Sequence, residues 1–144
     1  MTQMLIRPAG PDDMPFIFNS WLMSYRKAPA THGIPSNVYY SQHHKLIEEM
    51  LNRPSARAMI VCPENDRDLI CAYMVAEPMQ NTDGKAVMVH FVYVKETFRL
   101  LGIVKTLAKS FGINNDTVLF CSHYTSAAKP LVEKFGIVYN PYHL

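Results

Sequence analysis

The sequence predicts an α/β (α+β) fold, in which a central mixed and mostly antiparallel sheet is flanked by about four helices. Strand-like runs and segments of helical periodicity follow one another in the order β-α-α-β-β-β-α-β-α-β over 144 residues. The run Ala86–Val94 is apolar on both faces, as expected of a central strand that helices must cover. We expect one domain over residues 1–144.

The composition narrows the class of protein. A hydrophobic share of 49% and a charged share of 18% are typical of globular chains. A net charge of +2 argues against a nucleic-acid surface, and no apolar run reaches the ~20 residues that span a bilayer. The N-terminus lacks the apolar core of a signal peptide, so we expect a cytoplasmic protein. The spacing of Cys62, Cys71 and Cys121 indicates neither a zinc site nor a disulfide framework.

Two helices and two strands are expected in the first half of the chain. Asp12 can cap a helix that runs to about Tyr25 with apolar residues at a period of 3.6. Ser36 offers a cap for a second helix, which Arg53-Pro54 would end. Two strands are then predicted on either side of a turn, over Ala58–Cys62 and Leu69–Glu77.

The second half begins with the central strand Ala86–Val94. A third helix is predicted from about Leu101 to Phe111, ending at Gly112. Another strand, Thr117–His123, leads to a fourth helix capped by Gly136. The tail after Gly136 can add an edge strand, which Pro141 would end.

The connection between the central strand and the third helix has the features of an anion site. The first N–H groups of a helix lack internal partners and carry partial positive charge. Gly102 permits close approach to the backbone, and Arg99 and Lys105 add full charges. Five Lys or Arg face one acid between Gly84 and Asn115, a local balance of +4. This pattern predicts a phosphorylated ligand.

The same segment resembles the acetyl-CoA-binding signature of the GNAT superfamily of N-acetyltransferases. Phe98, Arg99 and Gly102 match this signature. Two positions depart from it: the family often has Gly where Leu100 stands, and Gly or Ala where Val104 stands. Residues 5–13 are similar to the family's first strand and helix entry, and residues 126–137 to its fourth helix, so the resemblance spans nearly the whole chain. Small GNAT-like proteins of tailed phages share the pattern of residues 93–103. This resemblance favours a viral protein that works in the cytoplasm of the host.

The resemblance implies that acetyl-CoA or CoA binds along the central strand and the following loop. Backbone groups of Val92, Tyr93 and Val94 would hold the pantetheine arm and the acyl carbonyl. Thr125 stands at the position of a family Asn that bonds the pantetheine amide. The phosphates would lie on the loop residues Arg99, Leu100, Leu101, Gly102, Ile103, Val104 and Lys105.

Two residues are candidates for the general base. His90 stands four residues before Val94, where many family members have a catalytic Glu, and strand alternation places it with Met88 and Val92. We expect it at the open end of the cofactor groove; the alternative is a core histidine bonded to neighbouring elements. Glu77 is the second candidate, and the alternative for it is a solvated carboxylate at a strand end.

Other chemical roles are less clearly assigned. The family's acid is a Tyr of the fourth helix, and Val132 stands there; Tyr124 and Tyr139 flank that helix. Tyr39 and Tyr40 fall where the family forms the wall of the acceptor pocket, although core packing explains them equally. No spacing of His with carboxylates supports a metal site, since the neighbours His43 and His44 point in different directions.

The leading interpretation is an acyl-CoA-dependent N-acyltransferase, with acetyl-CoA as donor and a small amine or a protein amino group as acceptor. The alternative is a catalytically weak or inactive protein of the same fold that works by binding a host or partner protein. Leu100, Val104 and Val132 favour the alternative, and Arg99, Gly102 and His90 favour the enzyme. The oligomeric state is open between a monomer and a homodimer.

Overall fold

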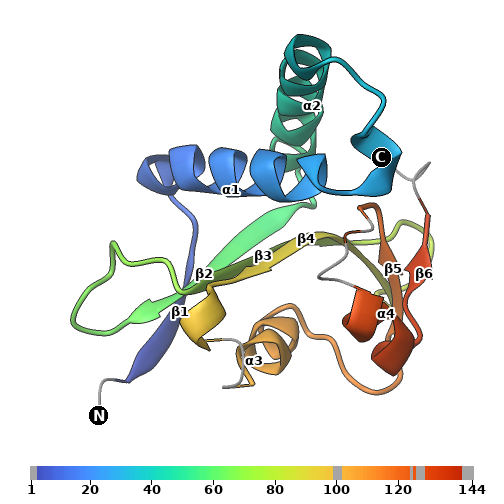
Figure 1. The fold of residues 1–144 in the computed structure, drawn as a ribbon. Helices are drawn as coiled ribbons and strands as arrows, with labels where there is room; N and C mark the ends of the chain where they lie inside the picture. Colours follow the sequence, from blue (N-terminus) through green and yellow to red (C-terminus); the bar gives the residue numbers. More distant parts are fainter. Residues whose placement is uncertain (1–2, 99–101, 124, 126–128, 141–144) are drawn as a thin grey trace.

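A computed structural model describes residues 3–98, 102–123, 125 and 129–140 (Figure 1). One six-stranded sheet carries the strands in chain order, antiparallel from the first strand to the fourth and parallel from the fourth to the sixth. The strands are β1 (Met4–Pro8), β2 (Arg57–Pro63), β3 (Ala72–Pro78), β4 (Ala86–Val94), β5 (Val118–Cys121) and β6 (Val138–Tyr139).

Helices cover both faces of this sheet, with α1 and α2 on one face and α3 on the other, and α4 lies beside β5 and β6 (Figure 1). The helices are α1 (Met14–Arg26), α2 (Ser36–Leu51), α3 (Ile103–Ser110) and α4 (Lys129–Phe135). Short 3₁₀ turns occur at η1 (Pro11–Asp13), η2 (Pro29–Thr31) and η3 (Glu96–Phe98). The predicted order and the mixed sheet are confirmed. Within the described ranges, every helix is too short or too polar to cross a lipid bilayer.

Several boundaries differ by a few residues from the sequence prediction, and two of these differences have a local reason. The N-cap of α1 is Asp13 rather than Asp12, because η1 adds a turn before the helix. The carboxylate of Asp13 accepts the Gly10 N–H at 2.8 Å. β3 begins at Ala72 rather than Leu69, although Cys71 still donates its N–H to Val61 O at 2.9 Å and so prolongs the contact with β2.

The sheet separates two hydrophobic clusters, which follow from the alternation of side chains along β3. Tyr73 and Val75 pack under α1 and α2, together with the fully buried Trp21 and Ile47. The intervening residues of β3 pack under α3, around the fully buried Leu107. Each face of the sheet therefore has its own core.

β4 contains a β-bulge that interrupts its alternation. Val75 pairs with Phe91 and the next residue of β3, Ala76, pairs with Val89, so His90 is an extra residue of β4. As a result Val89 and Val92 both pack in the cluster under α3, although they are three positions apart. The predicted common face for His90 and Val92 is wrong, because the bulge turns His90 toward the other face of the sheet.

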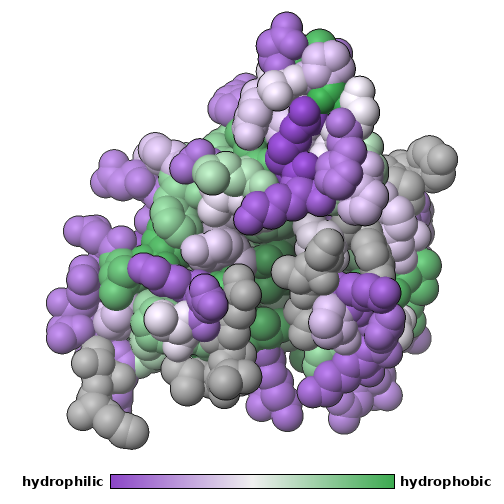
Figure 2. Space-filling model, viewed as in Figure 1, coloured by the Kyte–Doolittle hydropathy of each residue, from purple (hydrophilic) through white to green (hydrophobic). Residues whose placement is uncertain are grey.

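The parallel pair of β4 and β5 is short. Its register runs from Ala86 opposite Val118 to Val89 opposite Cys121, so the second half of β4 continues beyond its parallel neighbour. A strip of apolar side chains is visible between α3 and α4 on this face of the molecule (Figure 2). The pairing therefore ends at Val89 and Cys121, next to the bulge at His90.

Candidate functional site

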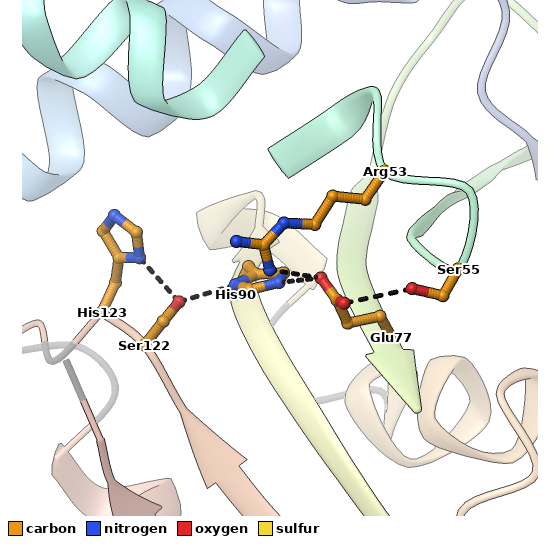
Figure 3. A network of polar contacts seen from close by, with 6 residues as sticks. All are labelled: Arg53, Ser55, Glu77, His90, Ser122 and His123. Carbon is orange, nitrogen blue, oxygen red and sulfur yellow. Dashed lines mark hydrogen bonds and ion pairs between the residues drawn. The ribbon is translucent and has the colours of Figure 1, made fainter. Parts of the chain in front are cut away.

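Glu77 is a buried carboxylate at the end of β3, with an exposed fraction of 7%. Its Oε2 is 2.6 Å from Nε2 of His90 and accepts Nη1–H of Arg53 at 3.1 Å, while Oε1 accepts the Ser55 hydroxyl at 3.1 Å (Figure 3). Burial alone would raise the pKa of Glu77, but the hydrogen bonds from His90 and Arg53 outweigh it and hold the pKa below its usual value. Glu77 is therefore ionised at neutral pH, and it is not a solvated strand end.

His90 lies in the interior rather than at an open end of a groove, with an exposed fraction of 1%. The expectation of an open position is wrong, because the bulge points the ring between β3 and β5. Its two ring nitrogens bind side chains: Nε2 contacts Glu77, and Nδ1 is 2.8 Å from Oγ of Ser122. The structure thus joins the two residues that the sequence nominated as bases, and both His90 nitrogens have polar side-chain partners.

The polar contacts continue from Ser122 to helix α2. Oγ of Ser122 is 3.0 Å from Nδ1 of His123, and Nε2 of His123 is 2.9 Å from Nε2 of His43. Sequence reasoning did not select Ser122 or His123; the available signal was a polar pair directly after an apolar strand that neighbours β4. Burial lowers the pKa of His43 to about 4, and it lowers the pKa of His123 well below its usual value.

Aromatic rings surround the outer two histidines. His43 stacks on Tyr25 and Tyr39, at centroid distances of 4.9 and 5.3 Å. The ring of His123 meets Tyr25 edge to face at 4.5 Å and Trp21 at 5.2 Å. This environment is apolar, which explains why charge on either imidazole is disfavoured.

The two tyrosines predicted to line a pocket occupy different environments. Tyr39 is buried, and its hydroxyl donates to Leu22 O at 2.6 Å, so it holds α1 and α2 together. Tyr40 is exposed. His44 stacks on Phe18, away from His43, as the sequence predicted. In the part of the chain that the structure describes, no group of His, Cys, Asp or Glu is arranged to hold a metal ion.

The predicted phosphate loop is described in part. Arg99, Leu100 and Leu101 lie outside the described residues. Gly102 is the N-cap of α3 with a φ of 67°, a left-handed conformation that favours glycine. A Cβ built on Gly102 would meet no atom within 4 Å, so the space beside this backbone is open.

The side chains that follow Gly102 point to different surroundings. Ile103 is buried and Val104 packs against the cluster under α3, so only their backbone groups face the helix end. Lys105 is exposed and stands one turn into the helix. Along β4, Val92, Tyr93 and Val94 are partly exposed, as is Thr125 after β5.

Solved structures of acetyltransferases share the fold of this chain. The YycN protein of Bacillus subtilis, a proposed acetyltransferase, is 14% identical, with a TM-score of 0.63 over 93% of this chain and 91% of its own. A GCN5-related N-acetyltransferase from Ralstonia eutropha is 17% identical, with a TM-score of 0.61 over 93% and 92%. The chain has the GNAT fold.

A third GNAT-fold neighbour is an aminoglycoside N-acetyltransferase, AAC(6')-Iy, whose structure is in complex with CoA. It is 15% identical, with a TM-score of 0.50 over 95% of this chain and 89% of its own. A second structure of the same enzyme is in complex with a bisubstrate analogue, CoA-S-monomethyl-acetylneamine. No protein-family model and no curated protein matches the sequence.

Within the GNAT fold, α4 is the element expected to carry the acid. Val132 is partly buried there, and Tyr124 lies outside the described residues. Tyr139 on β6 is exposed by 40% and lies beside Tyr25. Burial, and then the neighbouring Tyr139, raise the pKa of Tyr25 to about 12. Among the described residues, these two tyrosines and Tyr39 are the phenols near the histidine chain.

Proposed function

We propose that the protein is an N-acyltransferase that takes an acyl group from a CoA thioester, with acetyl-CoA as donor. The observation that carries the proposal is that β4 runs on past the end of its pairing with β5, at Val89 and Cys121, in a GNAT fold. The GNAT-fold neighbour in complex with CoA supports this choice of donor. The reduced thiols Cys62, Cys71 and Cys121 fit a reducing compartment, and we place the protein in the cytoplasm.

Residues on both sides of the gap suit the parts of CoA. Val92, Tyr93 and Val94 continue β4 past its parallel neighbour and would present backbone groups to the pantetheine arm, with Thr125 across the gap. Open space at Gly102 lets phosphate oxygens approach the first N–H groups of α3. Lys105, and Arg99 from the sequence pattern, would add charge there.

The chemistry of acyl transfer requires a base, because the acceptor amine is protonated at neutral pH. The ionised Glu77 in contact with His90 can stabilise a proton that reaches the imidazole. Since His90 is 1% exposed, an amine cannot touch it directly. The base must therefore act through another group. As acceptor we propose a small amine or a protein amino group, and the analogue bound by the aminoglycoside enzyme supports testing neamine first.

Calorimetric titration with CoA tests the donor site. We expect the parent to bind CoA and to gain thermal stability, by ~2.7 kcal/mol at a hundred times the Kd. Arg99→Glu and Gly102→Val should each abolish binding, because they reverse the charge and fill the open space at the start of α3. Lys109→Glu is the matched control, since it makes the same charge change in the last turn of α3.

Two outcomes would contradict this proposal. If the parent binds no CoA while its far-ultraviolet circular dichroism is that of a folded α/β protein, the donor is wrong. If Gly102→Val binds as tightly as the parent, the phosphates lie elsewhere. Release of the CoA thiol from acetyl-CoA in the presence of neamine or a lysine-rich peptide then measures turnover.

A second function, binding to a partner protein, is favoured by apolar exposure at one end of the sheet. Val118, Phe135 and Val138 are exposed by 50%, 52% and 48% on β5, α4 and β6. Such residues beside a sheet edge are typical of contact surfaces. Light scattering after gel filtration would detect a homodimer, and Phe135→Asp should dissociate it. A monomer at high concentration that retains no cellular protein would argue against this function.

A further inference from the structure

The hydrogen bonds between Glu77 and helix α2 form one continuous chain through the interior, and their directions can be derived. The starting point is Glu77, which is ionised and accepts from Arg53 and Ser55 as well as contacting His90. A carboxylate has no hydrogen to give, so Nε2 of His90 must carry one. When His90 is neutral, its Nδ1 is then an acceptor, and the hydroxyl of Ser122 must donate to it.

The remaining directions follow from the single hydrogen of a serine hydroxyl. Because Ser122 gives its hydrogen to His90, its contact with His123 must be a bond that Nδ1–H of His123 donates. Nε2 of the neutral His123 is therefore an acceptor, and Nε2–H of His43 donates to it. In the neutral state every donor in the chain points toward Glu77.

The same heavy atoms also accommodate one additional proton. If Nδ1 of His43 gains a proton, His43 can pass its Nε2 hydrogen to His123, His123 its Nδ1 hydrogen to Ser122, and Ser122 its hydrogen to Nδ1 of His90. His90 then carries hydrogen on both nitrogens, next to the Glu77 carboxylate at 2.6 Å. The bond from His90 to Glu77 keeps its direction, and the three bonds that link His90, Ser122, His123 and His43 survive with their directions reversed. Only hydrogens have moved.

The electrostatics favour the inner end of the chain for the positive charge. Burial disfavours charge on His43 and His123, whose surroundings are the rings of Tyr25, Tyr39 and Trp21. Burial also keeps the hydroxyls of Tyr25 and Tyr39 protonated, so neither supplies a negative charge. The charged groups in this region are Glu77 and Arg53 next to His90, and Arg26, which lies over the Tyr39 ring at 5.0 Å. A carboxylate at His90 is the one compensating anion in the described network.

We propose that His43 accepts the proton of the acceptor ammonium and that the chain through His123 and Ser122 moves it inward to His90 and Glu77. This inference rests on the proposed acyltransferase function and names the path of its base. His43 is the partly exposed end of the chain, on helix α2, so it is the member that an acceptor in solvent can reach. Only His43 would contact the acceptor. The other members of the chain would act through His43: Ser122, His123, His90 and Glu77.

The proton balance of the reaction is complete on this path. The ammonium gives one proton to the chain, and the freed nitrogen lone pair attacks the thioester carbonyl. The C–N bond forms as the C–S bond breaks, with its electron pair left on sulfur. The second nitrogen proton goes to the thiolate, and the chain later returns its proton to solvent through His43.

Nuclear magnetic resonance of ¹⁵N-labelled histidine tests the chain without any substrate. The neutral parent should show hydrogen on Nε2 of His43, on Nδ1 of His123 and on Nε2 of His90. On acidification, the first imidazolium to appear should be that of His90. Any other set of tautomers, or first protonation at His43 or His123, overturns the proposal.

Steady-state kinetics test whether the chain of hydrogen bonds takes part in acyl transfer. The substrates are acetyl-CoA and either neamine or a lysine-rich peptide. Ser122→Ala cuts the chain at one hydroxyl and should lower kcat about tenfold or more, with the KM for acetyl-CoA unchanged. Its acidic limb in the pH profile should move to lower pH, because His43 no longer shares a proton with His90. Ser122→Thr restores the hydroxyl and should recover the rate.

Ser20→Ala is the matched control, because Ser20 is a partly buried hydroxyl that bonds Tyr73 at 2.7 Å and lies outside the chain. It should lose stability comparably and keep kcat. A parent-like kcat in Ser122→Ala overturns the relay while leaving the acyltransferase in place. If the parent acetylates neither amine and binds no CoA, the acyltransferase function fails, and the role of the relay with it; the resonance experiment still reports whether the chain of hydrogen bonds exists.

Discussion

Arg7 and Asp13 form a two-bond ion pair that ties β1 to the start of α1. The distances are 2.7 Å from Nη1 to Oδ2 and 2.9 Å from Nη2 to Oδ1, and Nη2 also donates to Arg67 O at 2.8 Å. The hydrogen bonds from Arg7 lower the pKa of Asp13, against an opposing effect of burial. One contact thus fixes where the first strand ends and the first helix begins.

Replacing this carboxylate should destabilise the protein in a pH-dependent way. Asp13→Asn is expected to cost about 1–3 kcal/mol of unfolding free energy at pH 7, because it leaves Arg7 without its anion. The pKa of Asp13 is lower in the folded state, so its contribution is present above the unfolded pKa of about 3.9 and is lost as the pH falls through the folded value. Urea unfolding at pH 7 and pH 3 measures the difference.

The difference in unfolding free energy between the parent and Asp13→Asn should therefore be smaller at pH 3 than at pH 7. Asp12→Asn is the control, because Asp12 is exposed and one residue away. An equal loss in both variants, or a gap that stays constant from pH 7 to pH 3, would show that the ion pair with Arg7 contributes little.

Val132 of helix α4 stands where the resemblance predicts a tyrosine that acts as general acid. General acid help is worth ~10²- to 10⁴-fold in rate, so turnover without it should be slow. Val132→Tyr should raise the rate of thiol release from acetyl-CoA, provided the ring finds room beside the sulfur. Tyr124→Phe and Tyr139→Phe should each change the rate little. A large loss in either Phe variant would show that this tyrosine is the acid.

Strand β4 shows how far a pattern predicts an element. Its bounds, Ala86–Val94, were predicted without error, because apolar β-forming residues and flanking turn residues are local signals. The bulge at His90 was not predicted, because an extra residue is recognisable only from the partner strand. The assignment of faces by alternation failed at that one residue, and it was the residue that mattered for the site.

We expect the two cores on opposite faces of the sheet to belong to one folding unit. Ile47→Ala in α2 and Leu107→Ala in α3 each empty a fully buried site and should cost about 2–5 kcal/mol. The residues share no cluster, so the double variant should show the sum of the two losses within about 0.5 kcal/mol.

Chemical unfolding monitored by fluorescence and by circular dichroism tests this additivity. The two signals should coincide in one transition for every variant. Two separate transitions would show that the two faces of the sheet unfold separately. An interaction energy well above about 0.5 kcal/mol would show that the two sites are coupled.

Sequence patterns predicted the order of strands and helices and the bounds of the central strand. Together with the family resemblance, they selected Glu77 and His90 as candidate bases. Periodicity, caps and turns are encoded within a few neighbouring residues, so they need no knowledge of the fold. Only the tertiary structure decided that His90 is buried and that Ser122, His123 and His43 continue its hydrogen bonds. His43 and His123 stand 80 positions apart and meet at 2.9 Å, because the sheet order and the docking of α2 bring them together.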